Sequence, residues 1–182
     1  ISSLLLNPVM AIGSVVTAYI GQNICANNPE RAKKSYEVAR NLSVSIMVIG
    51  VLIIIPFAKP IAEFIVGPKN GSIVAVTVEY SIWILGTQPL MAIFQTHLSA
   101  FNGSGNNKYA LMMTFTRLWI LRVPLVLFFK YATDVGYAGI WYAMVISNLI
   151  ILFMGSYLYR KVKFQRKVFI DEHEEPLDNF SI

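Results

Sequence analysis

The stretch YAGIWYAMVISNLIILFMGSYLY, residues 137–159, contains no charged side chain. At a rise of 1.5 Å per residue, a helix of this length covers about 35 Å, enough to cross the hydrocarbon core of a bilayer. Four other predominantly apolar stretches occupy residues 3–26, 41–66, 76–101 and 109–131. Transmembrane β-strands would instead be about ten residues long and alternate in polarity. The sequence therefore predicts an all-α, polytopic transmembrane helix bundle with about five spanning helices.

The composition also indicates that lipid is the solvent around this chain. Of its 182 residues, 55% are hydrophobic and 14% are charged, whereas soluble domains carry about 25% charged residues. The single cysteine, Cys25, excludes an internal disulfide bond. The two histidines, His97 and His173, are far apart in sequence, and no Cys/His cluster has the spacing of metal ligands. The sequence predicts no metal site and no cofactor.

The net charge of +5 follows membrane topology rather than forming a nucleic-acid-binding stripe, because basic residues gather between the apolar stretches. One side of the membrane receives Arg31, Lys33, Lys34, Arg40, Lys108, Arg160, Lys161, Lys163, Arg166 and Lys167, and the other side receives Lys59, Lys69 and Lys130. The positive-inside rule then predicts a cytoplasmic C-terminus, with residues 161–182 as a cytoplasmic tail, and places Ile1 at the outer face.

The start of the chain leads to a further expectation. Residue 1 opens an apolar stretch with no initiator Met and no charged signal region. An odd number of spans that begins at the outer face also implies a missing upstream helix. We therefore expect this chain to be the C-terminal part of a longer protein.

The segment between the first two apolar stretches has the pattern of a short interfacial helix over residues 29–40. Asn28 is a favourable helix cap, and Pro29 suits the first helical position. Ala32, Tyr36 and Ala39 fall on one face of this helix. The basic residues spread over the rest of its surface, which is typical of a helix lying at a membrane surface.

Two arginines lie deep inside the fourth span, at Arg117 and Arg122, shortly before Pro124. A charge at this depth costs at least about 2.5 kcal/mol, so each guanidinium must face a cavity or a partner. A partner of this kind would be a backbone carbonyl or a helix end. Five residues of ideal α-helix place the two side chains roughly 140° apart, which predicts that they face different directions.

The third span carries a polar, small-residue stripe at spacings of four and three: Gln88, Ala92, Gln95, Ser99 and Asn102. Such stripes also serve ordinary helix packing in lipid, but two glutamines are larger than close packing requires, which favours cavity lining. Pro89 predicts a helix bend beside Gln88. Asn148 lies on an interior seam of the fifth span. The predicted substrate-cavity residues are Gln88, Gln95, Arg117 and Asn148.

Arg122 and His97 are secondary candidates for the site. His97 is off the polar stripe, which favours a hydrogen-bonded packing residue over a protonation site. Acidic residues within or beside the spans are Glu63 and Glu79, both near predicted outer ends. A transporter driven by protons or sodium usually needs a carboxylate at mid-membrane. We therefore expect the coupling carboxylate to lie outside this chain.

Three motifs in register resemble the multidrug and toxic compound extrusion (MATE) family. AYIGQNICA at residues 18–26, followed by PERA at 29–32, is similar to the family's helix that ends in GQN-x-GA before a polar E-R-A segment. FNGSGN at 101–106 resembles its G-x-G turn. The third match is RLWILRVPL at 117–125, followed by GIWYA at 139–143. The resemblance covers about residues 1–160.

The resemblance implies a twelve-helix transporter of two six-helix lobes, of which this chain is similar to helices eight to twelve. It further implies efflux of organic cations and drugs by proton or sodium antiport, with alternating access. The implied location is the bacterial or archaeal plasma membrane, and the implied partner is the missing N-terminal lobe. Cys25 replaces a usual Gly. Asn106 and Asn107 stand where some sodium-type members carry an acidic residue, which argues against a sodium site in this lobe.

Three alternatives remain at this point. A lipid-linked oligosaccharide flippase of the same broad superfamily would have a more cationic cavity. A non-transporting membrane scaffold would bind no solute. A membrane enzyme using His97 would need a cluster of acid, base or metal ligands, which the two histidines and outlying carboxylates do not supply.

Overall fold

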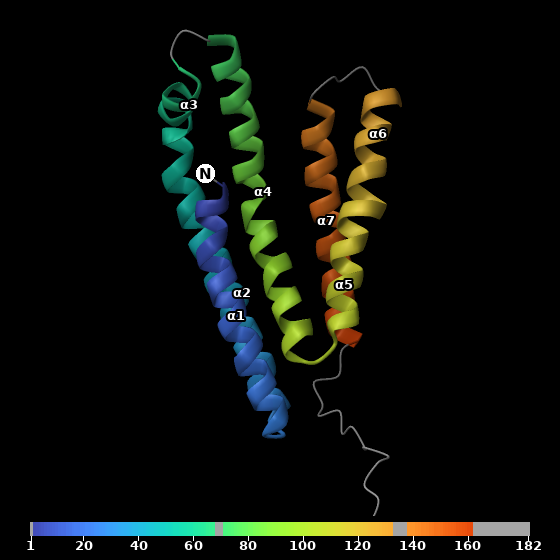
Figure 1. The fold of residues 1–182 in the computed structure, drawn as a ribbon. Coiled ribbons are helices and arrows are strands. Elements are labelled where there is room, and N and C mark those ends of the chain that lie inside the picture. The colour runs from blue at the N-terminus through green and yellow to red at the C-terminus, as the bar shows by residue number, and fades with distance from the viewer. Residues whose placement is uncertain (1, 68–70, 133–137, 162–182) are drawn as a thin grey trace, which may run out of the picture.

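The computed structural model describes residues 2–67, 71–132 and 138–161, and in these ranges every long element is a helix (Figure 1). The elements are α1 (Ser2–Cys25), α2 (Pro29–Ile54), the 3-10 turn η1 (Ile55–Phe57), α3 (Ala58–Val66), α4 (Gly71–Gly103), α5 (Asn107–Phe115), the π-helix η2 (Thr116–Arg122), α6 (Val123–Ala132) and α7 (Ala138–Lys161). They form five helical segments that are long and apolar enough to cross a membrane, called rods here: Leu5–Cys25, Pro29–Val66, Gly71–Gly103, Asn107–Tyr131 and Ala138–Lys161. The predicted all-α bundle is confirmed. Of the predicted tail, only Lys161 belongs to the described residues.

Helix α4 is the central rod of the bundle. It packs against α1 and α2 on one side and against α7 and α5 on the other, and Figure 1 shows it between the pair of α1 (blue) and α2 (teal) and the orange-red α7. One buried cluster, around Phe101, Ile20 and Ile151, lies toward the α1–α2 connection, and a second, around Leu85 and Met47, lies farther from it. Residues of α4 are therefore within reach of every other long rod.

Helix α2 contains both the segment expected as an interfacial helix, residues 29–40, and the start of the span that it was expected to lead into. It runs without a break from Pro29 to Ile54, because its buried residues recur every three or four positions across the expected boundary: Ala32, Tyr36, Ala39, Ser43, Met47 and Val51. The helix begins at Pro29 as expected, although the side chain of Asn28 makes no capping hydrogen bond. The break comes later, at η1, where Pro56 cannot donate a backbone hydrogen bond.

The fourth rod contains a π-helix that the sequence analysis did not predict. Its end is marked by the N–H of Val123 bonding to the carbonyl of Leu118, five residues earlier. Pro124 follows directly, and a proline ring clashes with the carbonyl four residues before it in a regular α-helix. The wider i→i+5 turns give that carbonyl room. Pro89 lies inside α4 without ending it, and the bend expected there stays a prediction.

The close approach of α1 and α4 at Gly103 generates a stability prediction. A Cβ on Gly103 would lie 2.6 Å from the backbone oxygen of Thr17, so Gly103→Ala must push the two helices apart. We expect a loss of about 1–3 kcal/mol, measured as a lower thermal midpoint of the full-length protein in detergent.

Gly86→Ala is the matched control, because Gly86 lies in the same helix and a Cβ there meets nothing within 4 Å. This variant should be neutral or stabilising by about 0.5–1 kcal/mol. Equal midpoints for the two variants would contradict the close contact between α1 and α4.

Candidate functional site

Arg117 lies on η2 and is directed at α4. Its Nη1 donates a hydrogen bond to Met91 Sδ at 3.1 Å, and its guanidinium carbon is 4.4 Å from the ring centre of Phe94. Sulfur is a weak acceptor, whereas the face of an aromatic ring attracts a cation. These contacts hold the charge inside the bundle without neutralising it.

Arg122 ends the same π-helix. In i→i+5 turns, residues five apart, as Arg117 and Arg122 are, lie closer together in angle than they do in an α-helix. The separation of about 140° assumed a regular α-helix, and this premise does not hold where the structure has η2. Both side chains are half-buried, and each has a buried Nε with no hydrogen-bond partner among the described residues.

Buried polar atoms without a partner gather on four helical rods. Among the described residues they are Ser43 Oγ, Gln88 Oε1, Arg117 Nε, Arg122 Nε and Asn148 Oδ1. The side chains of Gln88 and Asn148 are well buried, at 4% and 5% exposure. Each such atom costs about 1–3 kcal/mol, and native proteins leave few of them unless the group has a use.

These atoms lie at a similar depth in the bundle. Helices α4 and α7 run in the same direction, with Tyr80 packed on Trp141 near one end and His97 on Tyr159 near the other. Gln88 is eight residues beyond Tyr80, and Asn148 is seven beyond Trp141, so both are about 11–12 Å along their helices. Arg117 is level with Met91, one turn farther.

Ser43 reaches the same depth from α2. It lies seven residues, or about 10 Å, beyond Tyr36, which is hydrogen-bonded to His97 of α4. The unpartnered atoms therefore form a polar belt around the middle of the bundle, defined here as Ser43, Gln88, Arg117, Arg122 and Asn148. The sequence analysis missed Ser43, although its place on the buried stripe of α2 could have revealed it.

Gln95 has a different environment, because its part of the polar stripe packs against α1. A Cβ on Gly13 would lie 2.7 Å from Ser99 Oγ and 3.7 Å from Gln95 Cγ. Thr17 Oγ1 donates to the carbonyl of Ser99 at 3.3 Å. This half of the stripe is a close helix-packing surface, and the packing alternative fits Gln95 better than cavity lining does.

His97 belongs to a separate buried cluster with Tyr36 of α2 and Tyr159 of α7. Its Nδ1 is 2.8 Å from the carbonyl oxygen of Ile93, so that nitrogen carries the proton and Nε2 accepts the Tyr36 hydroxyl at 3.2 Å. The two tyrosine rings stack at 4.2 Å. His97 thus joins three helices by hydrogen bonding and packing. The sequence analysis missed both tyrosines, because their meeting depends on contacts between distant helices.

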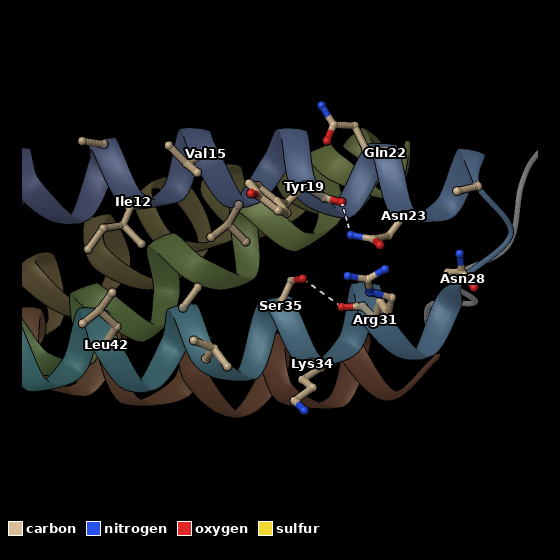
Figure 2. A pocket seen from close by; sticks show the side chains of 15 residues that line it. Ile12, Val15, Tyr19, Gln22, Asn23, Asn28, Arg31, Lys34, Ser35 and Leu42 are labelled. Atoms are coloured by element: carbon tan, nitrogen blue, oxygen red, sulfur yellow. Dashed lines mark hydrogen bonds between the residues drawn. The ribbon is translucent and has the colours of Figure 1, made fainter.

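Two open grooves flank the bundle. One, of about 990 Å³, lies between α1 and α2 near their connection (Figure 2). The other, of about 590 Å³, lies at the opposite end and is lined by Lys59, Glu63 and Glu79. The carboxylates that the sequence analysis placed near outer ends thus share one groove. The described residues contain no group of three or more His, Cys, Asp or Glu side chains placed to hold a metal ion.

Comparison with known proteins identifies the family, since the MatE family model matches residues 1–128. This chain belongs to the MatE family. A FAD transporter from Shewanella oneidensis is 29% identical over 170 residues, which cover 89% of this chain and 35% of that protein. The chain therefore spans about a third of the length of this curated relative.

Solved structures of MATE transporters share the fold. An inward-facing multidrug resistance MATE transporter of the MOP superfamily superimposes with a TM-score of 0.81 at 21% identity, covering 88% of this chain and 37% of that one. A MATE transporter in the bent conformation gives 0.76, also at 21% identity, with 88% and 35% coverage. The resemblance to this family inferred from three motifs is confirmed.

Two motif residues of this MatE chain have structural partners. Asn23 Nδ2 donates to the carbonyl of Tyr19 at 2.7 Å, which helps to close the last turns of α1. Asn106 is buried, and its Nδ2 donates to the carbonyl and hydroxyl oxygens of Ser104 at 3.2 and 3.0 Å. The Asn106 side chain thereby fixes the turn between α4 and α5.

The His97 cluster leads to a second stability prediction. Tyr36→Phe removes the hydroxyl that His97 Nε2 accepts and leaves this buried nitrogen without its partner. We expect a loss of about 1–3 kcal/mol and a lower thermal midpoint in the full-length MatE protein.

Tyr131→Phe is the control, because Tyr131 is 77% exposed and its ring contact with Lys130 survives the change. Its effect should stay within about 0.5 kcal/mol. A midpoint for Tyr36→Phe equal to that of this control would show that the hydroxyl contributes nothing.

Proposed function

We propose that this chain is one lobe of a secondary transporter that exports small organic solutes across the plasma membrane by alternating access. The observation that carries the proposal is the polar belt, whose five buried atoms have no partner among the described residues. Transporters bind their substrates near the bilayer midplane, at the interface between repeats. Polar and ionisable side chains at that depth are costly and mark substrate or ion pathways.

Proton or sodium antiport is the proposed energy source. The carboxylates of the described spans that line a groove, Glu63 and Glu79, lie at one end of the bundle and away from the polar belt. A coupling carboxylate at mid-membrane therefore belongs to the other lobe in this proposal. Binding of the coupling ion there would favour one orientation of the lobes over the other.

Two substrate classes fit different observations. Efflux of organic cations and drugs is what the motif resemblance implies, and in that case the other lobe supplies the negative groups. Export of an organic anion is favoured by Arg117 and Arg122, since guanidinium groups in a dry site bind carboxylate or phosphate strongly. The similarity to a FAD transporter supports this second class. Within this lobe, the arginines favour the anion.

Replacement of Arg117 by Gln in the full-length transporter tests its role in substrate binding. Loss of a charge-assisted hydrogen bond costs about 1.5–3 kcal/mol, so we expect uptake of FAD into inverted membrane vesicles to fall about 10- to 100-fold. Arg117→Lys should restore part of the activity. Uptake of a fluorescent organic cation is measured in the same vesicles.

Lys108→Gln is the control, because Lys108 is exposed in the first turn of α5 and lies outside the polar belt. Equal membrane levels and thermal midpoints must accompany all three variants. Loss of FAD uptake alone supports the anionic substrate, and loss of cation uptake alone supports the drug exporter. Unchanged uptake of both solutes in Arg117→Gln would refute a substrate-binding role for the belt.

A further inference from the structure

The groove between α1 and α2 changes character along its length. At its deep end the lining side chains are apolar, with Ile12 and Val15 from α1 and Val38 and Leu42 from α2. At the end near the α1–α2 connection the lining includes Arg31, Lys34, Asn28 and Gln22. Figure 2 shows the guanidinium of Arg31 directed from α2 across the groove toward α1.

Arg31 and Lys34, the two cations of this groove, have no carboxylate partner among the described residues, unlike the neighbouring Lys33. Lys33, between them in sequence, has its Nζ 3.2 Å from Glu30 Oε1 and lies outside the groove lining. Arg31 and Lys34 contribute uncompensated positive charge at one end of an otherwise apolar channel. Their chemistry is complementary to a phosphate group.

The length of the groove matches one leaflet of a bilayer. On α1 its lining runs from Ala11 to Ala26, which corresponds to about 22 Å of helix. Half of a bilayer, including its headgroup region, is about 20–22 Å thick. The apolar end therefore lies near the midplane when the basic end lies among the headgroups.

We propose that this groove is a binding site for an anionic phospholipid of the cytoplasmic leaflet. Its phosphate lies at the basic end of the groove against the guanidinium of Arg31, with Lys34 adding positive charge nearby on α2. One acyl chain lies along Val15, Val38 and Leu42. The side of the membrane follows from the positive-inside distribution of the chain's basic residues. The site is distinct from the polar belt, so the proposal does not depend on which solute the transporter carries.

A membrane lipid fits this surface better than a soluble anion does. The apolar half of the groove is open along its side, where Val15 and Val38 are 56% and 59% exposed. A small water-soluble anion would use the basic end and leave these side chains uncovered. An acyl chain covers them while its headgroup stays in the plane where anionic lipids already concentrate near basic side chains.

Native mass spectrometry of the full-length transporter tests the proposal, with dioleoyl phosphatidylglycerol and dioleoyl phosphatidylcholine titrated separately. The wild type should bind the anionic lipid more tightly than the zwitterionic one. Each lost charge should weaken binding of phosphatidylglycerol about fivefold, and the double variant Arg31→Gln/Lys34→Gln about 30-fold. Lys33→Gln, the neighbouring control, should retain wild-type affinity.

A second pair of variants tests the path of the acyl chain. Val38→Trp fills the groove and should weaken phosphatidylglycerol binding severalfold, whereas Leu52→Trp, at a 65% exposed position of the same helix outside the groove, should leave it unchanged. Equal binding of both lipids by the wild type would overturn the proposal. An unaltered affinity in the double charge variant, or in Val38→Trp, would do the same.

Two other occupants of the groove are distinguished by further measurements. Inorganic phosphate that binds as tightly as phosphatidylglycerol, with the same dependence on Arg31 and Lys34, would identify a soluble-anion site and overturn the lipid assignment. A spin label at position 38, in a Cys25→Ser background, should be accessible to dissolved oxygen in lipid nanodiscs. An inaccessible label would mean that protein covers the groove, and this result would also overturn the proposal.

Discussion

Lipid offers no hydrogen-bond partner, so a polar group inside the hydrocarbon core either finds a partner within the protein or carries an energetic cost. This constraint explains the position of α4 at the centre of the bundle. Its Ser99 carbonyl accepts from Thr17 of α1, its His97 accepts from Tyr36 of α2, and its Met91 accepts from Arg117 of η2. Polar contacts from three other rods thus converge on one helix.

The partners are unevenly distributed along the bundle. Toward the α1–α2 connection, side-chain hydrogen bonds are satisfied, as those of Thr17, His97 and Asn106 are. At mid-depth the polar belt retains atoms without partners among the described residues. Polar groups that are paired by hydrogen bonds hold helices together. A buried polar group without a partner carries a desolvation cost, and a ligand that supplies the missing hydrogen bond removes that cost on binding. This contrast is the basis for proposing the polar belt, rather than the end near the α1–α2 connection, as the part that binds a ligand.

The existence of the spans was predictable from sequence because it depends on length and hydropathy alone. Their internal form was not. The sequence predicted an interfacial helix up to residue 40 and a span from residue 41, because the first turns of α2 are polar. The buried stripe of α2 continues across that point. The π-helix depends on how Pro124 is accommodated. A proline in a helical sequence predicts a disturbed backbone hydrogen-bond pattern, but whether the helix kinks, ends or widens there depends on the helices packed against it.

The sequence identified candidate residues by their polar side chains within apolar spans. Their roles depend on which neighbouring helix each side chain packs against, which the sequence does not give. Gln88 and Gln95 are on one stripe, yet only Gln88 has an orphan buried oxygen among the described residues, whereas Gln95 packs near Gly13. Ser43 escaped notice because an isolated serine in an apolar span is common. The pairing of Tyr36 with His97 spans 61 residues of sequence, and no local pattern predicts such a contact.

Depth in the membrane separates the uses of positive charge in this lobe. In the proposed lipid site, Arg31 and Lys34 would lie at the end of the groove where headgroups and water reduce the cost of a charge. Arg117 and Arg122 lie deep in a helix, where a charge is tolerated only with compensation such as the ring of Phe94. Both proposals rest on the same guanidinium chemistry, with a lipid phosphate as the proposed ligand at the surface and a solute as the proposed ligand at the midplane. Because the cost of an uncompensated charge rises toward the midplane, the inner arginines have the stronger claim to a function beyond topology.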